Sequence, residues 1–154
     1  MDRVRTPWLL VVMHNPFYNS NADHHDEDAT LLAKRSFEAI FRRHKVDCVF
    51  SGHVHSYERF NEVFDGQLDG EGPVYINVGA VGIDSENEWK YLSSLSAHHD
   101  SHHFGYGTVS LINASHALFQ WWANKKEGGS RLADQKYIHS KHAWSRPWAL
   151  HLAK

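Results

Sequence analysis

Histidines follow directly after two apolar segments of this sequence. Residues 8–13 lead into His14, and residues 46–51 lead into a G-H-V-H step that holds His53 and His55. Imidazole is a common metal ligand, and a strand-like H-x-H step points both rings to one side, whereas a turn splays them toward two neighbouring ions. Two ions about 3.5–4 Å apart can clamp a phosphate and activate water near neutral pH. The pattern therefore predicts a metal site suited to phosphate ester hydrolysis.

Two further histidines, His24 and His25, lie in the polar loop after His14. An imidazolium beside a phosphate is both a charge partner and a general acid at low pH, so this pair is a candidate catalytic pair. The alternative is a pair of solvated histidines in an acidic run with Asp23 and residues 26–28. The residues alone leave both interpretations open.

The elements expected around these histidines are those of an α/β fold. Residues 8–13 and 46–51 are apolar runs typical of buried strands, and residues 30–44 between them carry apolar side chains at helical spacing. A strand, helix and strand in this order usually form a parallel crossover, and ligands bind at the carboxyl ends of such strands. Both loops that carry histidines are therefore predicted to lie at the carboxyl ends of these strands.

The second half of the chain is predicted to be mostly β. Residues 74–78 indicate a strand, and residues 107–112 and 117–122 a hairpin, while residues 84–104 indicate a long polar loop and the segment from Gly128 a tail without clear periodicity. That loop also contains a second group of histidines, namely His98, His99, His102 and His103. For these residues, exposure to solvent in a flexible loop is favoured over adventitious metal binding.

Composition limits the class of protein. With 154 residues, 42% of them hydrophobic and 22% charged, we expect one folded domain. A net charge of -2 without charge clusters argues against nucleic acid or an anionic membrane surface as a partner. The single cysteine, Cys48, excludes an internal disulfide and is expected to be buried. Residues 8–13 are too short for a membrane span or a signal sequence, and the compartment is not predicted.

Six segments carry a resemblance to a known family. In order along the chain, VVMHNPFYNSN, ADHH, VDCVFSGHVHSYER, PVYINVGAVG, FGYG and INASHALFQW resemble blocks of the purple acid phosphatases, which belong to the calcineurin-like metallophosphoesterases. Plant-type members are the closest match. The resemblance implies an α/β fold that is part of a layered αββα sandwich with the N-terminal half absent. Residues 1–127 would form the C-terminal half of that domain, and residues 128–154 a C-terminal tail.

The resemblance also implies a cofactor and roles for the histidines. Members of the family hold Fe(III) beside Zn(II), Mn(II) or Fe(II) and hydrolyse phosphate monoesters at acidic pH. By motif, His14 and His53 would bind the divalent ion and His55 the ferric ion. His24 and His25 would contact the substrate phosphate and protonate the leaving alkoxide.

Departures from the family pattern are equally informative. The D-x-G, G-D-x-x-Y and G-N-H-[DE] blocks that supply the other ligands do not occur in this sequence, and Tyr106 and Ala80 stand where the family commonly has histidine and an acidic or amide residue. Three histidines cannot fill two coordination spheres. We therefore expect a missing N-terminal half or a partner chain to complete the site.

Two other functions stay open at this point: a non-catalytic remnant that binds metal or a partner weakly, and a phosphodiesterase on the same scaffold. The N-A-S triplet at Asn113 is a candidate glycosylation site, which would fit the secreted, vacuolar or lysosomal habit of the family.

Overall fold

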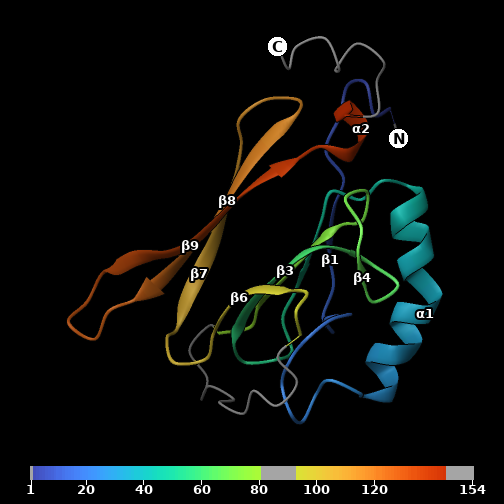
Figure 1. Ribbon diagram of the computed structural model, residues 1–154. Helices are drawn as coiled ribbons and strands as arrows, with labels where there is room; N and C mark the ends of the chain where they lie inside the picture. The colour runs from blue at the N-terminus through green and yellow to red at the C-terminus, as the bar shows by residue number, and fades with distance from the viewer. Residues whose placement is uncertain (1, 81–92, 145–154) are drawn as a thin grey trace.

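The computed structural model describes residues 2–80 and 93–144, which form three layers (Figure 1). The 16-residue helix α1 (Asp28–Arg43) covers one face of a mixed sheet, and a three-stranded antiparallel sheet covers the other. A second helix, α2 (Lys141–Trp144), is a single turn. The α/β class expected from the sequence is confirmed.

The mixed sheet contains the strands that lead to the histidine loops. Its members are β1 (Leu10–Val12), β2 (Cys48–Ser51), β5 (Val74–Val78), β3 (Tyr57–Phe64), β4 (Gln67–Leu68) and β6 (Ser96–Asp100). β1, β2 and β5 are parallel neighbours, whereas β3 runs antiparallel to β5, β4 and β6. β1 lies at the edge of the sheet. The predicted parallel pair of strands around α1 is therefore confirmed.

The antiparallel sheet consists of β7 (Gly105–Leu111), β8 (His116–Asn124) and β9 (Ser130–His139) in sequence order. Alternate residues of β8 are buried, with Phe119 and Trp121 at its centre. The predicted hairpin is confirmed. The prediction of an aperiodic segment from Gly128 onward was wrong for β9, which pairs with β8 along nearly its whole length. The division of the chain at residue 128 stays a prediction, and residues 145–154 lie outside the described part.

Two apolar cores hold the three layers together. The first lies between the sheets, where Tyr57 stacks on Trp121 with ring centroids 4.4 Å apart and Cys48 is fully buried, as expected. The second lies between the mixed sheet and α1, where Phe17 stacks on Phe41 at 5.4 Å. Because successive strand residues point to opposite faces, β2 sends Cys48 into the first core and Val49 into the second.

An ion-paired cluster joins the two sheets through polar side chains. Arg59 on β3 donates two hydrogen bonds to the carboxylate of Asp134 on β9, at 2.7 and 3.0 Å, and the hydroxyl of Tyr57 donates a third at 2.6 Å. Both charged side chains are 9% exposed. A bidentate pair of this kind fixes the relative position of two strands as well as compensating two buried charges.

Besides β9, the strands β3, β4 and β6 were not predicted from the sequence. β3 follows the H-x-H step directly, and β6 occupies residues 96–100 of the segment expected to be a polar loop. His98 and His99 therefore lie on a strand and not on a solvated loop, while the part of that prediction covering residues 84–92 falls outside the described residues. In residues 2–80 and 93–144, no helix is both long and apolar enough to cross a membrane.

Candidate metal centre

The two predicted histidine loops meet at the carboxyl ends of β1 and β2. β1 ends two residues before His14, and β2 ends two residues before His53. Since the strands are parallel neighbours in register, both loops emerge side by side, and the N–H of Gly52 donates to the carbonyl of His14 at 3.0 Å. The Nε2 atom of His14 lies 3.1 Å from the Nδ1 atom of His53.

Glu27 connects the loop after β1 to this pair. One carboxylate oxygen lies 2.7 Å from Nδ1 of His24, and the other lies 2.8 Å from Nε2 of His53. The rings of His24 and His53 have centroids 4.8 Å apart. Within the described residues, His24, Glu27 and His53 form a group whose ligand atoms lie within 4.8 Å of one another.

The carboxylate of Glu27 also determines which nitrogen of His53 carries a lone pair. Burial raises the pKa of Glu27, but the hydrogen bonds from His24 and His53 outweigh it and hold the pKa below its usual value. An ionised carboxylate only accepts hydrogen bonds, so Nε2 of His53 donates to it. In the neutral imidazole the lone pair is then on Nδ1, the atom that faces His14.

The spacing of the two ring nitrogens is that of ligands on one of the ions that the family resemblance implies. Two nitrogens bound to one tetrahedral ion at roughly 2.0–2.1 Å lie about 3.3 Å from each other. The observed 3.1 Å between His14 and His53 is close to that spacing. Imidazole nitrogens suit zinc and iron, and a carboxylate behind a ligand histidine orients the ring and raises its basicity. The residues fit a zinc or iron ion at this position.

The H-x-H step is a turn held by β5. His53 has a φ of 66°, in the left-handed region that non-glycine residues rarely adopt, and such strain occurs mainly at functional sites. The side-chain amide of Asn77 donates to the carbonyls of Val54 and Ser56, both at 2.8 Å. Next to it, Gly79 leaves no room for a side chain, because an added Cβ would lie 1.9 Å from the carbonyl oxygen of Val54. β5 therefore sets the position of His53.

Side-chain hydrogen bonds also shape the loop that carries His24. The side-chain oxygen of Asn21, which is buried, accepts hydrogen bonds from the backbone N–H groups of Asp23 and His24, at 2.8 and 3.2 Å. Ser20 donates from its backbone and its hydroxyl to buried Glu58 on β3, at 2.9 and 2.6 Å. Asparagine and serine form such turns readily, which explains why this segment adopts one.

The structure brings some of the predicted site residues together and not others. The rings of His14 and His24 both contact the ring of His53. His25 lies outside this group with its Nδ1 atom 3.4 Å from the carboxylate of Asp26, and His55 is half-buried two residues beyond His53. The predicted roles of all five stay predictions.

The predicted glycosylation site lies in the exposed turn between β7 and β8. The side-chain oxygen of Asn113 accepts hydrogen bonds from Ser115 and His116. Glycosylation there also stays a prediction.

Glu27 was not singled out from the sequence, where it was grouped with the solvated acidic residues of the loop. The available signal was the H-x-x-E spacing from His24, which places the two side chains on the same side of one turn. Its second contact, to His53, joins residues 26 positions apart and depends on the tertiary fold.

Two family models match consecutive parts of the chain. The calcineurin-like phosphoesterase model matches residues 2–57, which include His14, His24 and His53, and the model described as iron/zinc purple acid phosphatase-like protein C matches residues 72–135. The chain belongs to the purple acid phosphatase family.

Individual members of this family are similar over most of the chain. The Arabidopsis thaliana protein named "Probable purple acid phosphatase 20" is 40% identical over 127 residues, covering 80% of this chain and 30% of that protein. The Fe(3+)-Zn(2+) purple acid phosphatase 12 of the same plant is 32% identical over 168 residues, covering 96% and 34%. The chain spans about a third of the length of the curated relatives it matches.

A solved structure gives the same fold. The purple acid phosphatase isolated from yellow lupin (Lupinus luteus) seeds superposes with a TM-score of 0.76 at 22% identity, covering 90% of this chain and 26% of the lupin chain. The metallophosphoesterase fold expected from the sequence is thereby confirmed.

Proposed function

We propose that this chain carries the histidine-bearing part of a metal-dependent acid phosphatase site. The observation that supports the proposal most directly is the 3.1 Å approach of His14 Nε2 to His53 Nδ1, with Glu27 bonded to the opposite nitrogen of His53. A ring oriented in this way offers its lone pair to a metal ion. Family membership supports hydrolysis of phosphate monoesters as the reaction class.

The proposed roles follow the geometry and the family motifs together. His14 and His53 hold the divalent ion, His55 contributes to the ferric position, and Glu27 orients His53. The name of the Fe(3+)-Zn(2+) relative supports iron and zinc as the pair of metals. When bound, such ions supply Lewis acidity toward a phosphate ester.

One of two loop histidines would supply a proton during the reaction. His24 or His25 gives a proton to the leaving alkoxide, since both precede α1 in the loop beside His53. Nδ1 of His24 is already directed at Glu27, which fixes the orientation of its ring. His24 is therefore the better placed of the two general acids.

A complete binuclear centre needs ligands beyond these residues. Each ion takes at least four, and the described cluster provides two ligand imidazoles, His14 and His53, with Glu27 serving to orient His53. We propose that residues of another chain segment or subunit complete the site. The exposed edge strand β1, where the Val12 side chain is 82% exposed, offers a place for a further strand to pair.

Zinc titration of the chain by calorimetry tests the histidine site without requiring activity. His53→Ala removes a ligand, and we expect at least about tenfold weaker zinc binding. His44→Ala, an exposed histidine at the end of α1, serves as the matched control and leaves the affinity unchanged. Equal zinc affinity in both variants would contradict the proposed site.

Activity tests whether the chain is sufficient and which ester it prefers. The chain is loaded with iron and zinc, and p-nitrophenyl phosphate hydrolysis near pH 5 is compared with that of bis-p-nitrophenyl phosphate and with the His53→Ala, His55→Ala variant. Turnover of the monoester that is lost in the variant supports the phosphatase. Faster turnover of the diester would instead support a phosphodiesterase on the same scaffold. Zinc binding without any turnover would indicate that the chain binds metal but requires additional ligands for catalysis.

A further inference from the structure

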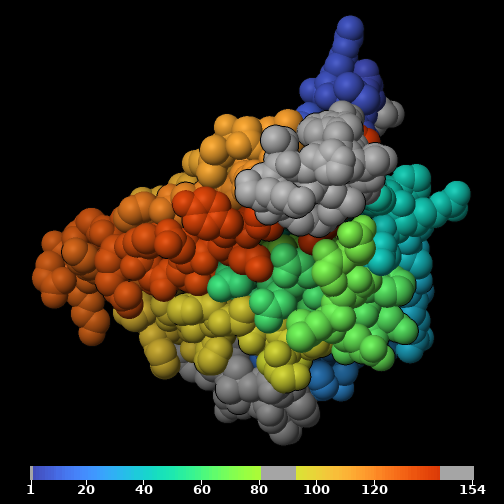
Figure 2. Space-filling model, turned by 45° about the horizontal axis from the view of Figure 1, so that its top comes forward, coloured from blue at the N-terminus to red at the C-terminus, as the bar shows by residue number. Residues whose placement is uncertain are grey.

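A cleft that is separate from the histidine cluster lies beside the turn that connects β8 and β9. Its volume is about 720 Å³. The residues that matter to its chemistry are His102, His103, Phe104, Lys125, Lys126 and Arg131. Figure 2 shows the β8–β9 turn projecting from the body of the molecule beside the segment that leads into β7. The cleft thus has one wall from each of these two segments.

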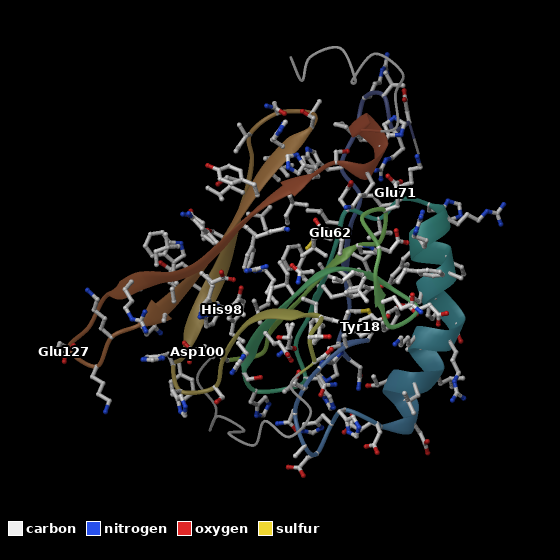
Figure 3. All side chains as sticks on the ribbon, viewed as in Figure 1. Tyr18, Glu62, Glu71, His98, Asp100 and Glu127 are labelled. Atoms are coloured by element: carbon white, nitrogen blue, oxygen red, sulfur yellow. The ribbon has the colours of Figure 1, made fainter. Side chains whose placement is uncertain are left out.

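Backbone hydrogen bonds hold both walls in place. The carboxylate of Asp100 accepts from the N–H groups of His102 and His103, at 2.9 and 3.2 Å, and lies 3.0 Å from the ring of His103. The N–H of Asn124 donates to the carbonyl of Phe104 at 2.7 Å and joins the two walls. Asp100 lies at the base of this arrangement, beside β7 (Figure 3). The cleft is therefore preformed and not a gap between loose loops.

The cations of this cleft are not compensated by carboxylates. In residues 2–80 and 93–144, no ion pair involves Lys125, Lys126 or Arg131. Glu127 is the one carboxylate among the described lining residues and lies at the outer tip of the turn (Figure 3). Three permanent positive charges thus face one negative charge in a chain whose net charge is -2.

We propose that this cleft binds a small molecule that carries two or more phosphate groups. Arginine and lysine side chains bind phosphate oxygens through charge-assisted hydrogen bonds. The volume lies within the range of about 300–1,000 Å³ found for small-molecule sites and exceeds the space that a single phosphate ion needs. Phe104, 40% exposed, offers an apolar surface to the body of the ligand. The proposal does not depend on the phosphatase site, because the cleft shares no residue with that site.

Calorimetric titration with tripolyphosphate, in EDTA so that no metal ion contributes, tests the proposal on the full chain. We expect tripolyphosphate to bind at least about tenfold more tightly than orthophosphate, since it makes several charge-assisted bonds at once. Lys126→Gln with Arg131→Gln should weaken tripolyphosphate binding by at least about tenfold. Lys126 lies on the β8–β9 turn and Arg131 near the start of β9, and both are exposed, so the fold should be retained.

Two controls separate this cleft from other anion-binding surfaces. Arg35→Gln with Arg43→Gln changes the net charge equally on exposed positions of α1 and should alter the affinity less than about twofold. His53→Ala should leave tripolyphosphate binding intact. The proposal is overturned if the α1 variant loses as much affinity as the cleft variant, if His53→Ala abolishes binding, or if a short DNA duplex binds the cleft more tightly than tripolyphosphate.

Discussion

Replacing Gly79 by alanine would place a methyl group where the loop that carries His53 already runs. The new Cβ would lie 1.9 Å from the carbonyl oxygen of Val54 and 2.8 Å from its carbonyl carbon. Cβ contacts below 3.0 Å are essentially not found in proteins, so the loop would have to move by at least about 1.1 Å, the difference between 3.0 and 1.9 Å. Asn77 holds the same carbonyl, and its 2.8 Å hydrogen bond would be stretched beyond normal range.

Two measurable losses follow from that movement. Overpacking costs about 1–3 kcal/mol and a lost buried hydrogen bond about 1 kcal/mol, so the free energy of unfolding should fall by about 2–4 kcal/mol. Metal ligands must lie within about 0.2 Å of their ideal positions, so a displaced His53 should bind zinc at least about tenfold more weakly. Urea unfolding and calorimetric zinc titration measure the two effects.

The same loop provides a matched control in Gly52. An added Cβ at this position meets no atom within 4 Å, and the residue directly precedes His53. Gly52→Ala should therefore change the unfolding free energy by less than about 1 kcal/mol and preserve zinc binding. If Gly79→Ala matched Gly52→Ala in both measurements, the argument that β5 positions the H-x-H turn would be wrong.

Other contacts lead to further expectations. Asp134→Asn leaves buried Arg59 without its charge partner and should lower the unfolding free energy by about 3–5 kcal/mol, measured in urea at neutral pH. Burial raises the pKa of Asp134, but hydrogen bonds, chiefly from Arg59, hold it below its usual value. The stabilisation is therefore present above the unfolded pKa of about 4 and lost as the pH falls through the folded pKa, so wild type and Asp134→Asn should converge in stability in acid. Ser20→Ala removes the hydroxyl that donates to buried Glu58 and should cost about 1–3 kcal/mol in the same assay. Val12→Lys, on the exposed edge strand, should reduce light scattering from aggregates while changing stability by less than about 0.5 kcal/mol.

The sequence alone determined the elements whose side chains follow a simple apolar pattern. β1, β2, β5, α1 and the β7–β8 hairpin were all predicted, because each has an apolar run or a regular period bounded by turn residues. The meeting of His14 with His53 was also predictable, since the carboxyl ends of parallel neighbours lie at one edge of a sheet.

Only the tertiary structure decided what happens where charged residues are buried. β3 was missed because Glu58 and Arg59 break its apolar pattern, and their partners, Ser20 and Asp134, come from distant parts of the chain. Glu27 likewise looked like a solvated acid until the fold placed it against His53. A local pattern reports which side chains avoid water, whereas the partner that makes a buried charge tolerable is chosen by contacts between segments far apart in the sequence.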